Sequence, residues 1–162
     1  EVVVTFSKNG YIKRIKSSAF RAQRRGGKGI LNAVKDEDEI ANIFSTKNHN
    51  SLLFFTNTGR VFRLSTYELP ETHRTAKGQP IVQLLSLAKD ESITAILDLT
   101  NTQETSQYLF LVSALGIVKR IEIADIENIR SSGLIVMKPH DGDVLRWVLT
   151  TAGSDTVFLV SR

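Results

Sequence analysis

Hydrophobic and polar residues alternate with a period of two along most of the chain, in stretches rich in β-branched and aromatic residues. This pattern is typical of β-strands that bury one face. No window carries the sustained spacing of three to four residues that marks an amphipathic helix. The pattern therefore predicts an all-β protein.

A strand–turn–strand pattern occurs three times in the chain. In each copy an apolar strand runs into a tight turn that closes on a glycine, and a second strand returns. The three turn glycines are Gly10, Gly59 and Gly116. They lie 49 and 57 residues apart, so the pattern repeats with a nearly constant period.

Two further landmarks follow each turn in the same order. A second glycine comes 19, 19 and 17 residues later and introduces a short apolar strand, and an acidic turn then precedes a fourth strand. The second glycines are Gly29, Gly78 and Gly133, the short strands are expected at 30–31, 81–82 and 134–136, and the acidic turns lie at 38–39, 91–92 and 142–143. Four strands at this period predict a propeller-like array of four-stranded blades.

The repeats divide residues 1–162 into one partial domain of about three blades plus one extra strand. The repeats span 2–50, 51–106 and 107–155, and residues 156–162 restate the first strand of a truncated fourth unit. That strand has two candidate partners, the first blade and the third. Because an uncovered blade edge invites pairing, open edges also offer a route to self-association. The start at Glu1, without methionine or signal peptide, leads us to expect a piece of a longer protein.

Composition removes several classes of protein. The chain has 41% hydrophobic and 23% charged residues, which is typical of a globular domain. It has no cysteine, which excludes disulfides, thiolate zinc sites and cysteine nucleophiles and favours a reducing, cytosolic compartment. Its apolar runs are far shorter than the ~20 residues of a membrane helix.

Basic residues are concentrated at the beginning of the chain. The formal net charge is +4, but residues 1–35 hold nine basic side chains against Glu1 alone, whereas residues 36–162 hold 12 basic and 16 acidic ones. A block of one sign is better explained by a polyanionic partner than by solubility. The alternative is that the acidic run 36–39 balances a basic face of the protein itself. Without that role, the acidic run is interpreted as the solvent-exposed tip of a β-turn.

A glycine-rich basic segment lies between the second and third strands of the first repeat. Residues 23–29 read Gln-Arg-Arg-Gly-Gly-Lys-Gly. Guanidinium forks, an ammonium group and backbone N–H groups that glycine leaves uncovered are the groups that bind phosphate oxygens. Neither nucleotide-binding glycine pattern occurs, which argues against a nucleotide pocket. The alternative is a surface turn without a ligand.

Residues 23–29 resemble the box motif, Q-[RK]-R-G-G-[RK]-G, of the C-terminal domain of DNA gyrase A. The second repeat is similar to the same family's second blade over 56–64, 67–70 and 74–82. The resemblance covers all 162 residues and implies a β-pinwheel, a propeller relative whose blades exchange strands. The family's domain has six blades, and this chain has about three. A complete box favours gyrase over its paralogue topoisomerase IV, whose equivalent domain carries degraded boxes.

The resemblance also implies a function. The chain would be a sequence-independent module that binds and bends or wraps duplex DNA within gyrase A, supporting ATP-dependent negative supercoiling by the holoenzyme. Its partners would be double-stranded DNA, the remainder of gyrase A, and gyrase B, in the bacterial cytoplasm at the nucleoid and away from membranes. It would be a non-catalytic domain of a type II DNA topoisomerase, an isomerase, with no cofactor in this chain.

The resemblance assigns DNA contacts to two groups of residues. The box comprises Gln23, Arg24, Arg25, Gly26, Gly27, Lys28 and Gly29. A second and weaker group, which we name the rim cations, comprises Lys13, Arg14, Lys16, Arg21, Arg60, Arg63, Arg74, Lys77, Lys119 and Arg120.

Residues that could carry catalysis have simpler explanations. The three tyrosines occupy strand or turn positions and are interpreted as half-buried packing residues rather than DNA-cleaving nucleophiles. The three histidines lack metal-ligand spacing and are interpreted as surface or strand residues, so no metal site is expected. Trp147 and the eight phenylalanines are expected mainly in the core, because a base-stacking platform would serve single strands.

Two functions from other classes stay open at this point. A propeller-type interaction scaffold could bind an acidic protein segment with its basic end, and it would fail to shift random duplex DNA in a gel. An enzyme in its own right would need detectable turnover, although the sequence offers no constellation of nucleophile, metal or cofactor.

Overall fold

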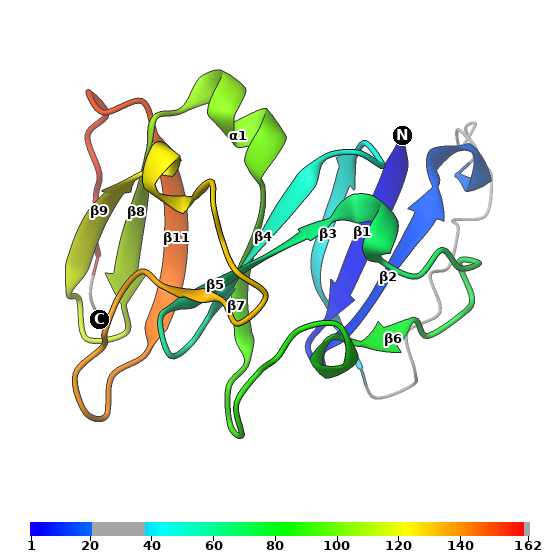
Figure 1. Cartoon of the computed structure of the whole chain (residues 1–162), viewed down its shortest axis with the longest axis horizontal. Helices are drawn as coiled ribbons and strands as arrows, with labels where there is room; N and C mark the ends of the chain where they lie inside the picture. Colours follow the sequence, from blue (N-terminus) through cyan, green and yellow to red (C-terminus); the bar gives the residue numbers. More distant parts are fainter. Residues whose placement is uncertain (21–37, 161–162) are drawn as a thin grey trace. The chain divides into compact units, whose positions relative to one another are not determined.

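Antiparallel hairpins form at the three turn glycines, as the alternation predicts. The structure is a computed structural model and describes residues 1–20 and 38–160. The hairpins are β1 (Val2–Ser7) with β2 (Tyr11–Lys16), β4 (Ser51–Thr56) with β5 (Arg60–Ser65), and β8 (Tyr108–Ser113) with β9 (Val118–Glu122), as Figure 1 shows. Gly10, Gly59 and Gly116 have φ values of +83°, +84° and +86°, in the region that only glycine enters without strain.

The strand that follows each acidic turn pairs with the first strand of its own hairpin. These strands are β3 (Ile40–Thr46), β7 (Ile93–Asp98) and β11 (Leu145–Thr151), paired antiparallel with β1, β4 and β8. The third landmark of the repeat is therefore confirmed as a strand in all three copies.

The fourth strand of each complete sheet comes from the following repeat. Strand β6 (Gln79–Pro80) pairs with β2, and β10 (Leu134–Ile135) pairs with β5. The sheet orders are β3-β1-β2-β6, β10-β5-β4-β7 and β11-β8-β9. Within the residues that the structure describes, β9 has no fourth strand beside it. The strand exchange that the resemblance implies is thus confirmed, and with it the all-β, pinwheel class.

The chain divides into two compact units. The first comprises Glu1–Asn50 and Leu64–Leu85, and the second Ser51–Arg63 and Ser86–Arg162. In the first unit, Val4 of β1 and Ile12 and Ile15 of β2 are buried. In the second unit, residues of two sheets form one cluster, which includes Leu53, Phe55, Leu109, Leu111 and Leu145.

Short helical turns connect the strands. They are η1 (Ser17–Ala19), η2 (Thr66–Glu68), η3 (Ile81–Gln83), α1 (Leu99–Thr105) and η4 (Ile123–Ile126). The sequence pattern missed α1, because seven mostly polar residues cannot carry a helical stripe. Its start has a local cause, since an Asp98 carboxylate oxygen accepts a hydrogen bond from the Asn101 N–H at 3.1 Å.

Two of the short strands differ from the prediction. The strand expected at 81–82 lies two residues earlier, because Ile81 donates its N–H to Gly10 O at 2.8 Å and starts a 3₁₀ turn. The strand expected at 134–136 ends at Ile135, because Val136 and Met137 both donate their N–H groups to Gly59 O. The strand expected at 30–31 lies outside the described residues.

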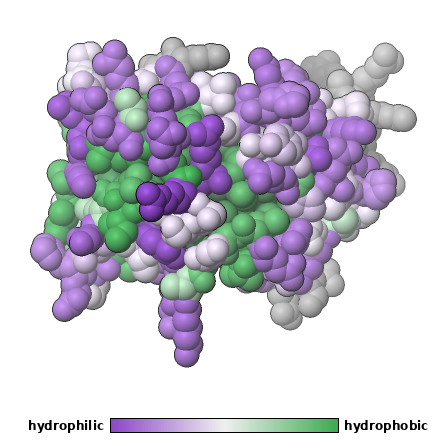
Figure 2. All heavy atoms as spheres, in the orientation of Figure 1, coloured by the Kyte–Doolittle hydropathy of each residue, from purple (hydrophilic) through white to green (hydrophobic). Residues whose placement is uncertain are grey.

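Some hydrophobic residues expected in the core lie at the surface. Trp147 is 52% exposed and Phe158 is 85% exposed, which corrects the core assignment for both. The register of β11 shifts between Leu145 and Trp147, so strict alternation fails there and the indole faces solvent. Tyr67, expected to be half-buried, is 56% exposed. Figure 2 shows one face on which hydrophobic residues reach the surface between hydrophilic ones.

Residues 156–160 have no regular structure. Their assignment to a fourth repeat, like the bounds of the other repeats, therefore stays a prediction from the sequence.

Candidate nucleic-acid interface

The box and Arg21 lie outside the described residues. Nine rim cations are described, and the structure separates them by what their side chains touch. The hairpin register explains where most of them lie. Lys13 and Lys119 stand three residues after a turn glycine, and Arg14, Arg63 and Arg120 stand four residues after one. Successive residues of a strand point to opposite faces, so these two sets face opposite sides of their sheets.

Arg14 binds the structure of its own unit. Its side chain is 14% exposed, and its Nε donates to Leu69 O at 2.8 Å. Its Nη1 donates to Glu71 Oε2 at 2.7 Å and to Asn48 Oδ1 at 3.1 Å. The guanidinium therefore joins β2 to the turn that ends η2 of the following repeat.

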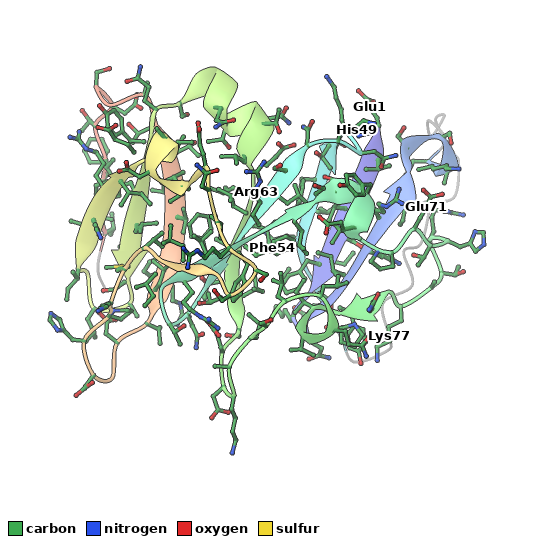
Figure 3. All side chains as sticks on the ribbon, in the orientation of Figure 1. Glu1, His49, Phe54, Arg63, Glu71 and Lys77 are labelled. Atoms are coloured by element: carbon green, nitrogen blue, oxygen red, sulfur yellow. The ribbon has the colours of Figure 1, made fainter. Side chains whose placement is uncertain are left out.

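Arg63 makes the equivalent link in the second unit. Its Nη1 donates to Glu127 O at 2.6 Å, next to the end of η4, and its Nε and Nη2 donate to Ser51 Oγ at 3.1 and 2.9 Å. Arg63, labelled in Figure 3, is exposed, so part of its guanidinium reaches solvent. Arg14 and Arg63 thus each hold a backbone carbonyl of the next repeat.

Arg60 is anchored by a buried carboxylate. Its Nε donates to Glu91 Oε1 at 2.9 Å and its Nη2 to Glu91 Oε2 at 2.5 Å, and the Glu91 side chain is fully buried. The hydrogen bond from Arg60 lowers the pKa of Glu91 to about 2, against the opposing effect of burial. The same pair raises the pKa of Arg60. Arg60 also binds Ser132 O and Ser86 O, so its donors are engaged within the unit.

The Arg60 anchor belongs to a device that all three repeats share. The acidic turn before β3, β7 or β11 holds the tip of the neighbouring hairpin. Asp38 accepts from the Asn9 N–H at 3.0 Å, Glu91 accepts from the Thr58 hydroxyl at 2.7 Å, and Asp143 accepts from the Leu115 N–H at 3.0 Å. The sequence placed the acidic turns correctly but missed their role, because their partners lie 28–33 residues away.

Lys13 is the most buried of the described rim cations. It is 5% exposed, and its Nζ donates to Arg74 O at 2.8 Å and to Ala76 O at 2.6 Å. Burial lowers its pKa. The Lys13 ammonium group therefore donates its hydrogen bonds to protein carbonyl groups rather than to water.

The remaining described rim cations reach solvent to a greater extent. The Lys16 side chain is 68% exposed and lies 3.3 Å from Glu71, and Arg74 is half-buried. Lys77, labelled in Figure 3, is exposed. Its Nζ lies 3.6 Å from the centre of the Tyr11 ring. Lys119 is exposed with its Nζ on Val136 O at 2.9 Å, and Arg120 is exposed over the Tyr108 ring. These five side chains are the described rim cations that a polyanion could reach most readily.

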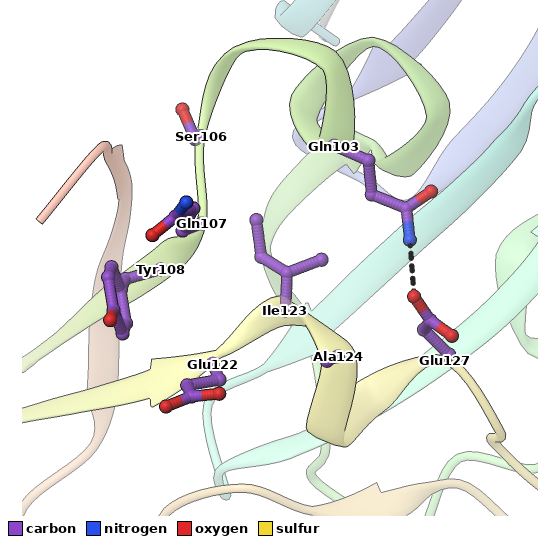
Figure 4. Close-up of a pocket in the computed structure, with 8 residues that line it drawn as sticks. All are labelled: Gln103, Ser106, Gln107, Tyr108, Glu122, Ile123, Ala124 and Glu127. Atoms are coloured by element: carbon purple, nitrogen blue, oxygen red, sulfur yellow. Dashed lines mark hydrogen bonds between the residues drawn. The ribbon is translucent and has the colours of Figure 1, made fainter.

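A shallow pocket of about 450 Å³ lies in the second unit, beside the Tyr108 ring (Figure 4). Glu122 and Glu127 line it, and Gln103 donates its Nε2 to Glu127 Oε1 at 3.0 Å. Two carboxylates repel phosphate, so this pocket is not part of an anion site.

Potential metal ligands are scattered over residues 1–20 and 38–160. No group of three or more potential metal ligands occurs there, and His49, His73 and His140 are all exposed. No helix in these ranges has the length and hydrophobicity to cross a membrane.

The repeated hairpins, the strands exchanged between successive repeats and the carboxylate-anchored turns define a propeller-like β-repeat domain. A family profile described as "DNA gyrase C-terminal domain, beta-propeller" matches residues 1–47, 50–99 and 107–152. The chain belongs to this family.

Individual relatives agree with the family. The DNA gyrase A protein of Streptococcus pyogenes serotype M1 is 44% identical over 160 residues, which cover 98% of this chain and 19% of that protein. The chain thus spans about a fifth of such relatives. Among solved structures, the C-terminal domain of DNA topoisomerase IV superposes with a TM-score of 0.78 at 27% identity, covering 94% of this chain and 46% of the other. A DNA gyrase A C-terminal domain gives 0.64 at 29% identity, covering 89% and 45%.

Proposed function

We propose that the chain is a module of gyrase A that binds duplex DNA through its phosphates and bends or wraps it without reading sequence. The observation that carries this proposal is the complete seven-residue box within a segment of nine basic side chains and one acidic one. The family match and the 44% identity to a gyrase A protein support it. Phosphate contacts made by distributed Lys and Arg side chains carry no sequence information, so binding should be non-specific.

The proposal extends to the larger assembly. The module would support ATP-dependent negative supercoiling together with the rest of gyrase A and with gyrase B, in the cytoplasm at the nucleoid. Bending 20–30 base pairs costs on the order of 1–6 kcal/mol, which the distributed contacts must offset. Among residues 1–20 and 38–160 no strand pairs with the outer edge of β9, and Val118 and Leu115 nearby are 44% and 71% exposed, which supports self-association through blade edges.

Replacement of three box cations tests the proposal. The variant Arg24→Ala, Arg25→Ala, Lys28→Ala in the full enzyme should abolish wrapping and negative supercoiling, while far-UV circular dichroism of the domain stays unchanged. A matched control, Lys89→Ala, Lys138→Ala, Arg146→Ala, removes the same charge from exposed positions outside the box and rim and should supercoil normally. An undiminished supercoiling rate in the box variant would reject the assignment.

The equivalent domain of topoisomerase IV is the second candidate. The TM-score of 0.78 to such a domain favours it on fold. The 44% identity to a gyrase A protein and the complete box favour gyrase. Introducing negative supercoils into relaxed plasmid distinguishes the two, because wrapping through an intact box is what this activity requires in our proposal.

A further inference from the structure

The loop 72–78 occupies the same place in the second repeat as the box does in the first. Gly78 follows Gly59 by 19 residues, as Gly29 follows Gly10. At this alignment Arg74 corresponds to Arg25 and Lys77 to Lys28. The loop therefore keeps two of the cationic positions, although it has lost the paired glycines.

Two residues of β2 support this loop from one face of the sheet. Tyr11 and Lys13 are two positions apart on the strand, so their side chains point to the same side. Lys13 Nζ holds Arg74 O and Ala76 O, and the ring of Tyr11 lies under the Lys77 ammonium. Ala76 donates its N–H to His73 O at 3.1 Å, which closes the turn between them.

The end of the loop is fixed by a close backbone contact. Gly78 has a φ of +89°, and a Cβ added there would come within 2.4 Å of Ile12 O. The next residues enter the sheet, where Gln79 pairs with Ile12. The loop thus has two fixed points, the Lys13 ammonium and the β2–β6 ladder, and Lys77 stands between them.

Charge around Lys77 leaves its ammonium available. It lies over an aromatic ring, and no carboxylate among the described residues is within ion-pair distance of it. The pKa of Asp38 is lowered, against the opposing effect of burial, by hydrogen bonds from the Ser7 side chain and from the backbone of Asn9 and Glu39, and the Lys77 charge adds only the smallest contribution. An exposed ammonium on a supported loop is suited to a phosphate oxygen.

The second unit offers a comparison. There Phe62 takes the position of Lys13 and lies beneath Gly133, where an added Cβ would be 3.0 Å from its ring. The residue at the position of Lys77 is Ser132, which is uncharged. The position of Lys13 thus holds a buried lysine where a lysine directly precedes the loop glycine, and a phenylalanine where a serine does.

We propose that Lys13 is a positioning residue for a second phosphate-contact loop, residues 72–78, in which the Lys77 ammonium touches DNA and the Lys13 ammonium does not. This inference rests on the proposed function. It separates two rim cations that the sequence treats alike, one as ligand and one as internal support.

Chemical modification of lysines in the unmutated chain tests this assignment. Amine acylation followed by mass spectrometry should modify Lys77 in the free protein and not in its complex with a random-sequence duplex, whereas Lys13 should stay unmodified in both. Lys89, exposed in the second unit, is the control and should react in both states. Reaction of Lys13 in the free protein with protection in the complex would overturn the inference. So would reaction of Lys77 in the complex, or equal protection of Lys89.

A pair of variants tests the coupling between the two residues. Each lost phosphate contact reduces the slope of log affinity against log salt by about 0.9. Lys77→Gln should reduce the slope by one such step, Lys13→Met by the same step, and the double variant by no more than either. A merely structural role for Lys13 would leave the slope unchanged, and a direct contact would make the two steps additive; either result overturns the inference.

Two outcomes outside this pattern are also decisive. Should Lys13→Met fail to fold by circular dichroism, the modification experiment on the unmutated chain decides the assignment by itself. Absence of any duplex binding by the unmutated chain at low salt would overturn both the proposed function and this inference, whereas binding with the wrong lysine pattern overturns the inference alone.

Discussion

At the scale of single residues, the chain separates cations that support the fold from cations that face solvent. Lys13, Arg14 and Arg60 each satisfy several donors within their own unit. The side chains of Lys16 and Lys77, in contrast, are exposed to solvent. Basic side chains that the sequence groups together can therefore differ in role, because burial and nearby carbonyl groups decide where each charge is stabilised.

The buried carboxylate of Glu91 should be the most sensitive of the acidic anchors. Glu91→Gln should lower the free energy of unfolding by about 3 kcal/mol, because it leaves the Arg60 guanidinium without its counter-charge. Urea denaturation followed by circular dichroism measures the loss. Glu39→Gln is the control, because Glu39 pairs with Lys8 at the exposed surface and such pairs contribute little. Equal effects of the two changes would contradict the anchoring role of Glu91.

The same residue should make stability dependent on acid. The pKa of Glu91 is about 2 in the folded chain, below its ordinary value of 4.5. The folded state therefore binds this proton less readily than the unfolded state, so the stabilisation is complete above pH 4.5 and is lost as pH falls towards 2. The difference in unfolding free energy between wild type and Glu91→Gln should shrink over that range. A difference independent of pH would contradict the low pKa.

At the scale of elements, the turn glycines determine where the following repeat can attach. Gly59 O accepts hydrogen bonds from the N–H groups of Val136 and Met137 at 2.9 and 3.1 Å, which fixes the end of β10. A Cβ at Gly59 would lie 2.0 Å from Met137 O. The glycine therefore serves two purposes, a left-handed turn and room for the incoming strand.

Replacing Gly116 and Gly59 by alanine, one at a time, distinguishes the cost of the left-handed turn from the cost of filling the space for the incoming strand. Gly116→Ala should cost about 1 kcal/mol for the positive φ alone, because no described atom lies within 4 Å of the added Cβ. Gly59→Ala should cost a further ~2 kcal/mol from overlap with the Met137 backbone. Thermal unfolding of the two variants measures the difference. Similar melting temperatures would show that close approach of β10 is unimportant.

At the scale of the whole molecule, binding of a polyanion should depend steeply on salt. Each neutralised phosphate releases a condensed counterion, so six or more contacts should lower the affinity for random duplex by about 10³–10⁵ between 50 and 200 mM salt. Fluorescence anisotropy over a salt series measures the slope. A flat salt response would contradict phosphate binding by the box and rim cations.

Most of the architecture could be predicted from the chain, because its signals are local. Alternation, turn glycines and acidic turns place the three hairpins and the strands β3, β7 and β11, and the box is recognisable as seven consecutive residues. The helix α1 escaped prediction, and the strands expected at 81–82 and 134–136 were placed with inexact bounds, since elements of that length have too little pattern to define.

The sequence by itself determined the repeat, the order of its strands and the concentration of positive charge in the first 35 residues. Only the tertiary structure decided which cations are free, because the carbonyls and carboxylates that bind Lys13, Arg14 and Arg60 lie 26–72 residues away along the chain. It also turned Trp147 outward through a register shift that alternation cannot foresee. Contacts between distant residues depend on how the strands are exchanged, and that exchange is a property of the folded chain.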